Sequence, residues 1–347
     1  MTGNRAKLEG VAASQPPLLL HLSVAITAGA LALLPLTSVA DTTRADVVTV
    51  VDTATGSPVA DVPVGQFPVG LAMTSDGAHV FVSNRESATI SVIDTRSSSV
   101  AGTFAVGGVP EAIALSPDAT QLYVADRQDN SLIALDATSG VVSQSIAVGG
   151  VPETIAVSPD GSTVDIGTSS PDELVQINPA TGQKFATVPL SSSPQSFAVS
   201  ADGRHLFATT YNSSARAGGA LVDFDVASGT TSTLDSFSSV PQMLVLSADG
   251  NSAFVTHLAT LGVSFVGLHP EGLAADISLP GLPAGMAVAP DGTRLFVAAG
   301  VAPGELDTID TATSQITNRL PLSGTPQGVA VSPDGSRVFV AHRGDGQ

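Results

Sequence analysis

The chain of 347 residues contains no cysteine and no tryptophan, and it has only two tyrosines. Without cysteine it cannot form disulfides, thiol nucleophiles, cysteine-ligated zinc sites or thioether-linked haem. The shortage of large aromatic side chains removes most of the surfaces on which sugars, quinones and unpaired bases stack. The sequence also lacks a Gly-x-Ser-x-Gly elbow, a His-Glu-x-x-His helix motif and a glycine-rich phosphate loop. These absences argue against several large enzyme classes.

Basic residues are scarce as well. Lys and Arg number 13 against 31 Asp and Glu, which gives a formal net charge of −18. A surface this acidic repels phosphate backbones, and no run of basic residues reverses the sign locally. We therefore expect no nucleic-acid partner.

The first 40 residues differ from the rest of the chain. Arg5 and Lys7 precede a long apolar run, and residues 38–40 (Ser-Val-Ala) have the small-x-small pattern of a signal-peptidase site. We interpret residues 1–40 as a signal peptide and residues 41–46 as a short linker. The alternative is a retained membrane anchor, because about 20 apolar residues are enough to span a bilayer. Both interpretations predict a protein that is secreted, periplasmic or on the cell surface.

A four-residue phrase of the type Ser-Pro-Asp-Gly recurs seven times in the remainder. Its aspartates are spaced by 42, 42, 42, 47, 42 and 43 residues. They are Asp76, Asp118, Asp160, Asp202, Asp249, Asp291 and Asp334. A fixed period of this length, built from short strands, is typical of the blades of a β-propeller.

Each repeat contains four apolar runs bounded by Pro, Gly, Asp or Ser, which indicates four antiparallel strands joined by hairpins. The chain begins with the third and fourth strands of a blade, at residues 47–51 and 59–64, and ends with first and second strands, at 327–331 and 337–341. We therefore predict an all-β fold, a single seven-bladed β-propeller over residues 47–347. The N- and C-terminal strands share the last blade and close the ring, which removes the exposed edges that an open array would present.

Two positions repeat within the blades. The first strand has a small central residue, and the second strand an aromatic one, in nearly every copy. The small residues are Ala72, Ala114, Ala156, Ala198, Val245, Ala287 and Ala330. In the third copy Asp165 replaces the aromatic residue. We consider a functional break, a shifted register and a hydrogen-bonded buried aspartate as explanations for it.

Segments such as Leu122-Tyr123-Val124-Ala125-Asp126 and Val331-Ser332-Pro333-Asp334-Gly335 resemble the YVTN-type propeller repeats of bacterial and archaeal extracytoplasmic proteins. The resemblance covers almost all of residues 47–347. It implies the propeller fold but no single activity. Proteins with repeats of this type include surface-layer components, lactonase-like propellers and domains of redox enzymes.

Twelve aspartates fall in predicted turns: the seven above and five that begin the second hairpins, Asp52, Asp94, Asp136, Asp225 and Asp310. In a propeller these two sets of turns share one face. One interpretation is a calcium-binding face. The other, which we favour, is that each aspartate accepts hydrogen bonds from the amides of its own turn, since the turns lack the dense oxygen spacing of calcium loops.

The opposite face is less regular and is the better candidate for binding. Its candidate residues follow the proline that opens a blade or end a second strand. They are Glu111, Glu153, Gln195, Gln242, Gln327, Asp126, His257 and His342. Around the mouth of a central channel they could bind a polar ligand, a partner or a divalent cation, and the alternative is a mouth that holds only water.

The favoured function is therefore a non-enzymatic binding or scaffold module, with no cofactor predicted. Its partner would be a protein, a component of the cell envelope or a small polar ligand, with contact to a membrane only if residues 1–40 are retained. The alternative, which the resemblance suggests, is a lactonase-like hydrolase with a metal or carboxylate site at the channel mouth. The extra residues in the fourth repeat lie at 211–220, a Gly/Ser/Ala-rich loop that we expect at the rim of this mouth.

Overall fold

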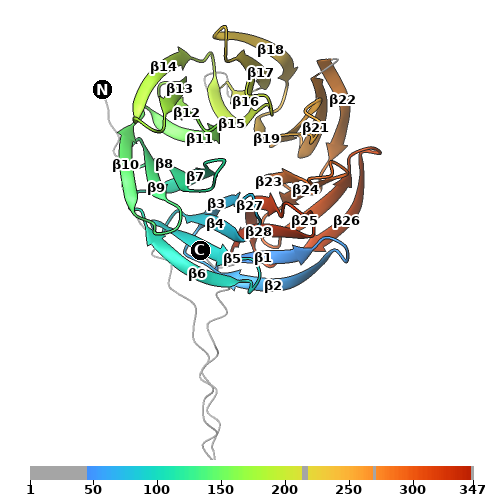
Figure 1. The fold of residues 1–347 in the computed structure, drawn as a ribbon. Coiled ribbons are helices and arrows are strands. Elements are labelled where there is room, and N and C mark those ends of the chain that lie inside the picture. The colour runs from blue at the N-terminus through green and yellow to red at the C-terminus, as the bar shows by residue number, and fades with distance from the viewer. Residues whose placement is uncertain (1–44, 213–217, 269–270, 345–347) are drawn as a thin grey trace, which may run out of the picture. The chain divides into compact units, whose positions relative to one another are not determined.

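The computed structural model describes residues 45–212, 218–268 and 271–344. These residues form seven four-stranded antiparallel sheets arranged radially around a central axis, as Figure 1 shows. The prediction of a seven-bladed β-propeller is confirmed. No helix in the described ranges is both long and apolar enough to cross a bilayer. The predicted signal segment, residues 1–40, lies outside the described residues.

Each blade runs from an inner strand beside the axis to an outer strand at the perimeter. Blade 1 is β3 (Pro68–Met73), β4 (His79–Asn84), β5 (Thr89–Asp94) and β6 (Ser99–Ala105); blade 2 is β7 (Pro110–Leu115), β8 (Gln121–Asp126), β9 (Ser131–Asp136) and β10 (Val142–Ala147). Blade 3 is β11 (Val151–Val157), β12 (Val164–Ser169), β13 (Glu173–Asn178) and β14 (Gln183–Pro189); blade 4 is β15 (Ser193–Val199), β16 (His205–Tyr211), β17 (Gly219–Asp225) and β18 (Thr230–Phe237). Blade 5 is β19 (Pro241–Leu246), β20 (Ser252–His257), β21 (Gly262–Leu268) and β22 (Glu271–Ser278); blade 6 is β23 (Pro283–Val288), β24 (Arg294–Ala299), β25 (Glu305–Asp310) and β26 (Gln315–Pro321). Blade 7 is β27 (Thr325–Val331), β28 (Arg337–Arg343), β1 (Val47–Asp52) and β2 (Ser57–Pro63).

The hydrophobic core lies between neighbouring blades. In six of the seven blades the small residue of the inner strand pairs with the aromatic residue of the second strand, as Ala72 pairs with Phe81 and Ala114 with Tyr123. Phe81 of blade 1 then packs with Ile113 of blade 2 in one buried cluster. Six further clusters of this kind complete the core of the described residues. A small residue near the axis and a large one further out fit the wedge-shaped space between two blades.

The turns between first and second strands and between third and fourth strands lie together on one side of the ring, which we call the turn face. The Thr53 backbone N–H, in a second-hairpin turn, donates to the carbonyl of Ser336 in a first-hairpin turn. The turn aspartates bond within their own turns: Asp118 Oδ1 accepts from the Thr120 N–H and the Ser116 hydroxyl, and Asp94 Oδ1 accepts from the Ser97 N–H. This confirms the interpretation of these aspartates as turn-forming residues.

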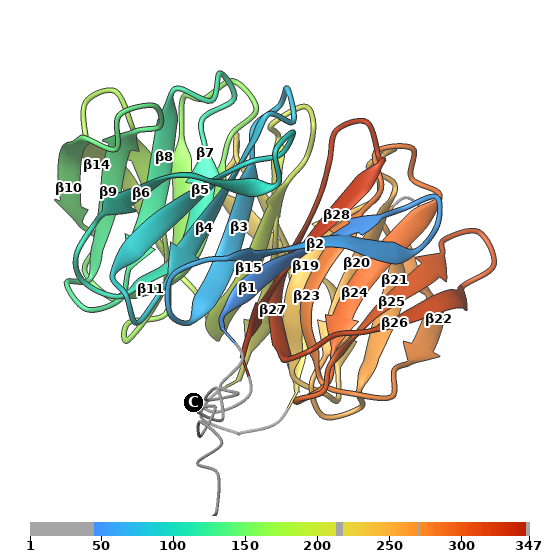
Figure 2. The same ribbon diagram turned by 90° about the horizontal axis from the view of Figure 1, so that it is seen from below.

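The ring closes through blade 7, where β1 pairs with β28 on one side and with β2 on the other. Asp46, just before β1, secures this junction. One carboxylate oxygen accepts from the Gly344 N–H at 2.8 Å, and the other accepts from the Phe67 N–H at 2.7 Å. Figure 2 shows β1 and β2 beside β28 in the edge-on view. The two ends of the propeller and the loop into blade 1 are thus held by one buried carboxylate.

Asp165 keeps the register of the other blades. It pairs with Ala156 and with Gln176, in the positions that aromatic residues and their partners occupy elsewhere. The side chain is buried and accepts a hydrogen bond of 2.8 Å from Gln176 Nε2. The third explanation offered for Asp165, a hydrogen-bonded buried aspartate, is therefore confirmed, and a shifted register is wrong.

Candidate functional site at the channel mouth

The second side of the ring, the mouth face, carries the loops between second and third strands and the loops between blades. Three of the residues expected to line its central opening are instead buried in the interior of the ring. Asp126, His257 and His342 are only 1%, 4% and 1% exposed. Asp126 Oδ1 accepts from the Val109 and Gln128 N–H groups and so fixes the loop into blade 2. The expectation that these side chains face the channel mouth is wrong, because each lies against a face of its blade, where neighbouring strands or loops cover it.

The two histidines form equivalent contacts in blades 5 and 7. His342 Nε2 lies 2.6 Å from Thr49 Oγ1, and that hydroxyl donates to Asp61 Oδ1 at 2.6 Å. In blade 5, His257 Nε2 lies 2.7 Å from Ser264 Oγ, which donates to Asp276. Because an ionised carboxylate only accepts, each hydroxyl gives its proton to the aspartate and accepts from the imidazole N–H. The hydroxyl stands between histidine and aspartate, so neither set has the order of a serine-hydrolase triad.

Glu111 and Glu153 do lie on the mouth face, as expected, and each is matched by an arginine from the loop that follows a second strand. Arg127 Nη1 donates to Glu153 Oε2 at 2.7 Å, and Arg85 Nε lies 3.5 Å from Glu111 Oε2. The Ser169 hydroxyl donates to the second oxygen of Glu153 at 2.6 Å. These contacts link blades 1, 2 and 3 around the axis.

Phe67 extends this row toward blade 7. The guanidinium carbon of Arg343 lies 4.6 Å from the centre of the Phe67 ring, and that of Arg85 lies 5.4 Å from it, so both arginines lie within cation–π range of this ring. Phe67 has φ of 56°, a left-handed conformation that is costly for a bulky side chain. Its N–H is held by Asp46 and its carbonyl by the Arg85 N–H. Strained residues held in this way often mark functional sites.

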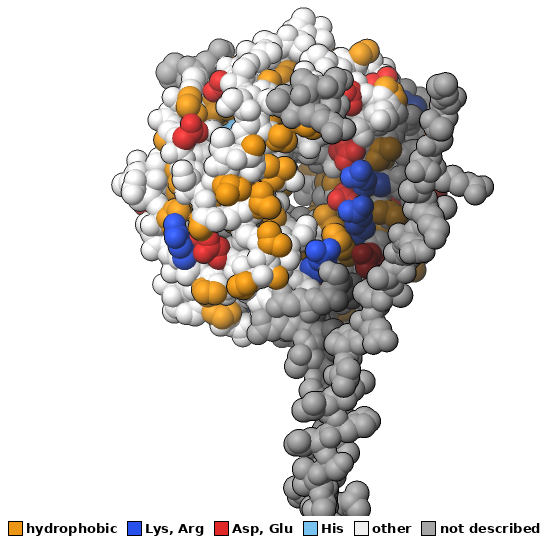
Figure 3. Space-filling model, turned by 180° about the vertical axis from the view of Figure 1, so that it is seen from behind, with side chains coloured by type: hydrophobic (Ala, Val, Ile, Leu, Met, Phe, Trp, Pro, Cys, Tyr) orange, Lys and Arg blue, Asp and Glu red, His pale blue; other side chains and the backbone are white. Residues whose placement is uncertain are grey.

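We call this set the arginine row: Arg343, Phe67, Arg85, Glu111, Arg127 and Glu153. It holds three guanidinium groups against two carboxylates, although the protein as a whole is strongly acidic. Figure 3 shows blue and red side chains alternating along one side of the central hollow. This basic cluster could not be predicted from the sequence, because its arginines are separated by 42 residues or more and come together only in the folded ring.

Burial raises the pKa of Glu111 above its ordinary value, although Arg85 and Arg127 oppose this effect. Glu153 adds a smaller contribution that also raises it. Oε2 of Glu111 is buried and has no hydrogen bond with adequate geometry among the described residues. Glu111 is therefore the less well satisfied of the two carboxylates.

The three glutamines do not join the arginine row. Gln195 donates to carbonyl oxygens of its own strand, those of Ser193 and Pro194. Gln242 has a buried side-chain oxygen without a hydrogen-bond partner in the described part of the chain, and Gln327 is partly exposed. Residues 213–217 of the expected rim loop lie outside the described residues. Its two flanks, Tyr211 and Gly219, pair as the ends of β16 and β17.

The mouth face is apolar on its other side. A hollow of about 540 Å³ between blades 5 and 6 is lined by Leu261, Leu282, Val301, glycines and prolines, with Glu305 as the one charged residue of the lining. Leu282 and Val301 are 42% and 63% exposed, so both present apolar surface to the solvent in this hollow. Figure 3 shows hydrophobic side chains gathered on the side of the central hollow opposite the charged ones. In the described ranges no three His, Asp or Glu side chains come close enough to share a metal ion.

Comparisons with known proteins agree with the fold. Residues 38–161 match the family described as YNCE-like beta-propeller. A solved structure from Kuenenia stuttgartiensis, hydrazine synthase, is similar with a TM-score of 0.72 and 23% sequence identity, over 81% of this chain and 94% of that chain. No curated protein matches the sequence. At this identity the structural likeness shows the propeller fold alone.

Proposed function

We propose that this protein is a binding module that recognises a carboxylate-bearing ligand, or a partner segment of that kind, at the arginine row. The carrying observation is the placement of three arginines beside one opening of a molecule with a net charge of −18. A guanidinium binds a carboxylate through two parallel hydrogen bonds, which gives both strength and orientation.

Arg343 is the best placed of the three to meet a ligand. Arg85 and Arg127 each lie against a glutamate, whereas Arg343 forms no ion pair within the described residues and stacks on Phe67. Stacking fixes the plane of the guanidinium and leaves its N–H edge available. The ion pairs on the neighbouring arginines hold the rest of the row in place.

The apolar hollow opposite the row suggests the remainder of the ligand. A molecule with a carboxylate at one end and an aliphatic body would match the charged side with its head and Leu282 and Val301 with its tail. Sites of this kind combine an apolar lining with a few placed polar groups. The proposed role is binding without catalysis, in a compartment outside the cytoplasm to which residues 1–40 direct the chain.

The test uses octanoate and octylammonium as a matched pair that differs only in the charged end. Isothermal titration of the full chain should show binding of octanoate and little binding of octylammonium. Arg343→Ala and Phe67→Ala should each weaken octanoate binding by about tenfold, the scale of one charge-assisted hydrogen bond. Arg96→Ala, a change in a second-hairpin turn away from the row, should leave it unchanged.

Equal binding of the two probes, or a Kd that Arg343→Ala leaves unaltered, would contradict the proposal. Circular dichroism melting curves of each variant separate loss of the site from loss of the fold.

The alternative function, a lactonase-like hydrolase, is favoured by one observation. Glu111 has a raised pKa and a buried oxygen without a good hydrogen bond, features that suit a proton-transferring carboxyl group. Hydrolysis of an aliphatic lactone that is abolished by Glu111→Gln and kept in Glu153→Gln would support this role in place of binding alone.

A further inference from the structure

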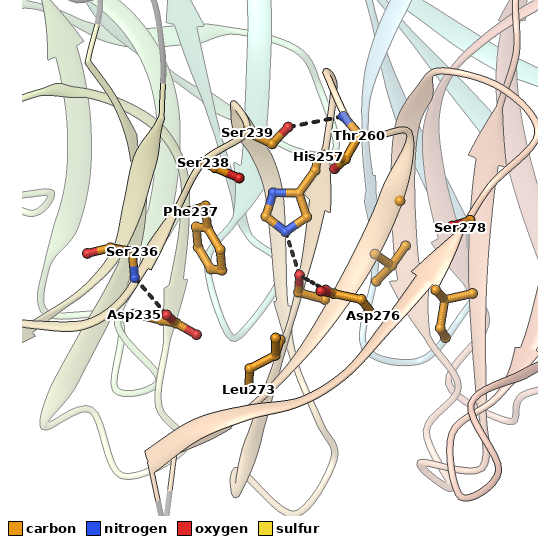
Figure 4. Close-up of a pocket in the computed structure, with 14 residues that line it drawn as sticks. Asp235, Ser236, Phe237, Ser238, Ser239, His257, Thr260, Leu273, Asp276 and Ser278 are labelled. Carbon is orange, nitrogen blue, oxygen red and sulfur yellow. Dashed lines mark hydrogen bonds between the residues drawn. The ribbon is translucent and has the colours of Figure 1, made fainter.

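A second hollow lies at the perimeter of the ring, between the outer strands of blades 4 and 5. It has a volume of about 380 Å³ and is lined by β18 and the loop after it on one side and by β22 on the other. Figure 4 shows Asp235 and Phe237 on the first wall and Leu273 and Asp276 on the second, with His257 between them. This site is separate from the arginine row and is independent of the function proposed above.

His257 gives the hollow an unusual floor. His257 is only 4% exposed. Its ring packs edge-to-face with that of Phe237, and the ring centres lie 4.6 Å apart. Nε2 is engaged by Ser264, whose hydroxyl donates to Asp276. The N–H of the neutral ring is therefore on Nε2, and Nδ1 carries a lone pair. Nδ1 has no hydrogen-bond partner in the described part of the chain.

The side chains that line the hollow include hydrogen-bond acceptors but no Lys or Arg. Two carboxylates, Asp235 and Asp276, face it from different blades, and its hydroxyl groups come from serines and Thr260. Apolar surface is provided by Phe237, by Ile277 and by Leu273, which is 54% exposed. Such a lining attracts a positive charge attached to an aliphatic or aromatic body.

We propose that this hollow binds a small organic ammonium ion. The ammonium group donates to His257 Nδ1, which has no hydrogen-bond partner among the described residues, and the carboxylates of Asp235 and Asp276 attract its charge from the two walls. The alkyl part packs on Phe237 and Leu273. A bare metal ion is the less suitable occupant, because no three His, Asp or Glu side chains of the described residues are grouped closely enough to coordinate one.

The first experiment is a titration with n-butylammonium, with butanoate and n-butanol as probes of equal length that lack the positive charge. We expect calorimetric binding of n-butylammonium alone. Asp235→Asn should weaken it by about tenfold, since it removes one charged acceptor without touching the His257 contacts.

Blade 7 provides a matched control. There Asp61 accepts from the hydroxyl that contacts His342, just as Asp276 accepts from the hydroxyl that contacts His257. Asp276→Asn should weaken binding of n-butylammonium, and Asp61→Asn should not. If both variants bind alike, the hollow between blades 4 and 5 is not the site.

Nuclear magnetic resonance of the imidazole nitrogens tests the floor without any substitution. Addition of n-butylammonium should shift the Nδ1 signal of His257 and leave that of His342 in place. Binding of butanoate equal to that of n-butylammonium, or unaltered affinity in Asp235→Asn, would overturn the proposal.

Discussion

At the scale of single residues, the aspartates of this protein divide into two electrostatic classes. Those in the turns accept hydrogen bonds from hydroxyl and backbone N–H groups, which lower the pKa of Asp160, Asp249 and Asp334 to about 2. Asp165 and Asp307 are buried within blades, and burial raises the pKa of each to about 6. Gln176 only partly offsets this effect at Asp165, as Arg319 does at Asp307.

The two classes predict opposite dependences of stability on pH. The folded protein holds a proton on Asp165 up to pH about 6, whereas the unfolded chain loses it near the ordinary value of 3.8. Stability should therefore rise as the pH falls from 7 to 5, by about 1 kcal/mol for each buried aspartate. Below pH 4 the turn aspartates act the other way, because they lose their favoured ionised form as the pH falls toward about 2.

Urea unfolding at pH 5 and pH 7 measures the first effect. Asp165→Asn should reduce the difference in unfolding free energy by about 1 kcal/mol, and Asp307→Asn by a similar amount. Asp129→Asn, a change at an exposed loop residue, serves as control. An undiminished difference in Asp165→Asn would show that this group ionises normally in the folded protein.

At the scale of elements, the inner strands of neighbouring blades pack closely against one another. A Cβ atom added at Gly285 of β23 would lie 2.3 Å from the carbonyl oxygen of Gln327 in the next blade. At Gly328 of β27 it would lie 2.4 Å from the carbonyl oxygen of Val69. Neither glycine has a positive φ, so the requirement is for space between neighbouring strands and not for an unusual backbone.

Gly285→Ala should therefore destabilise the protein by about 1–3 kcal/mol, the usual cost of overpacking a rigid site. Gly102→Ala is the matched control, because it also lies in a strand without a positive φ and its new Cβ would meet nothing within 4 Å. Thermal unfolding followed by circular dichroism compares the two. Similar melting temperatures would mean that the blades can move apart at the axis.

At the scale of the whole molecule, closure of the ring and the arginine row share a junction. Asp46 holds the N–H groups of Gly344 and Phe67, and Phe67 in turn supports Arg85 and Arg343. The contact that joins the ends of the propeller therefore also sets the position of the proposed ligand site.

Asp46→Ala should leave two backbone donors without acceptors and destabilise the closed ring by about 2 kcal/mol or more. It should also weaken octanoate binding, because Phe67 loses its anchor. Asp46→Asn keeps one acceptor oxygen, so its stability and its affinity for octanoate should lie between those of Asp46→Ala and those of the unchanged protein. Limited proteolysis near residues 64–67 and 344 reports local opening, and a variant as resistant as the unchanged protein would contradict this role.

The sequence by itself determined the repeat and therefore the fold. Seven turns of the Ser-Pro-Asp-Gly type, a small residue on each first strand and the split of blade 7 between the termini are local features, and local features are readable along the chain. The role of the turn aspartates could be predicted for the same reason, since each bonds within four residues of itself.

The tertiary structure decided which side chains meet. Sequence placed Asp126, His257 and His342 at the channel, but the pleat of the second strand directs them onto buried faces of their blades. It gave Glu111 and Glu153 correctly as mouth residues and missed Arg85, Arg127, Arg343 and Phe67. Those partners lie in different repeats, and only the closure of the ring brings residues 67 and 343 into contact. Spacing along a chain fixes the repeat, whereas contacts between repeats depend on the angle and order of the blades in space.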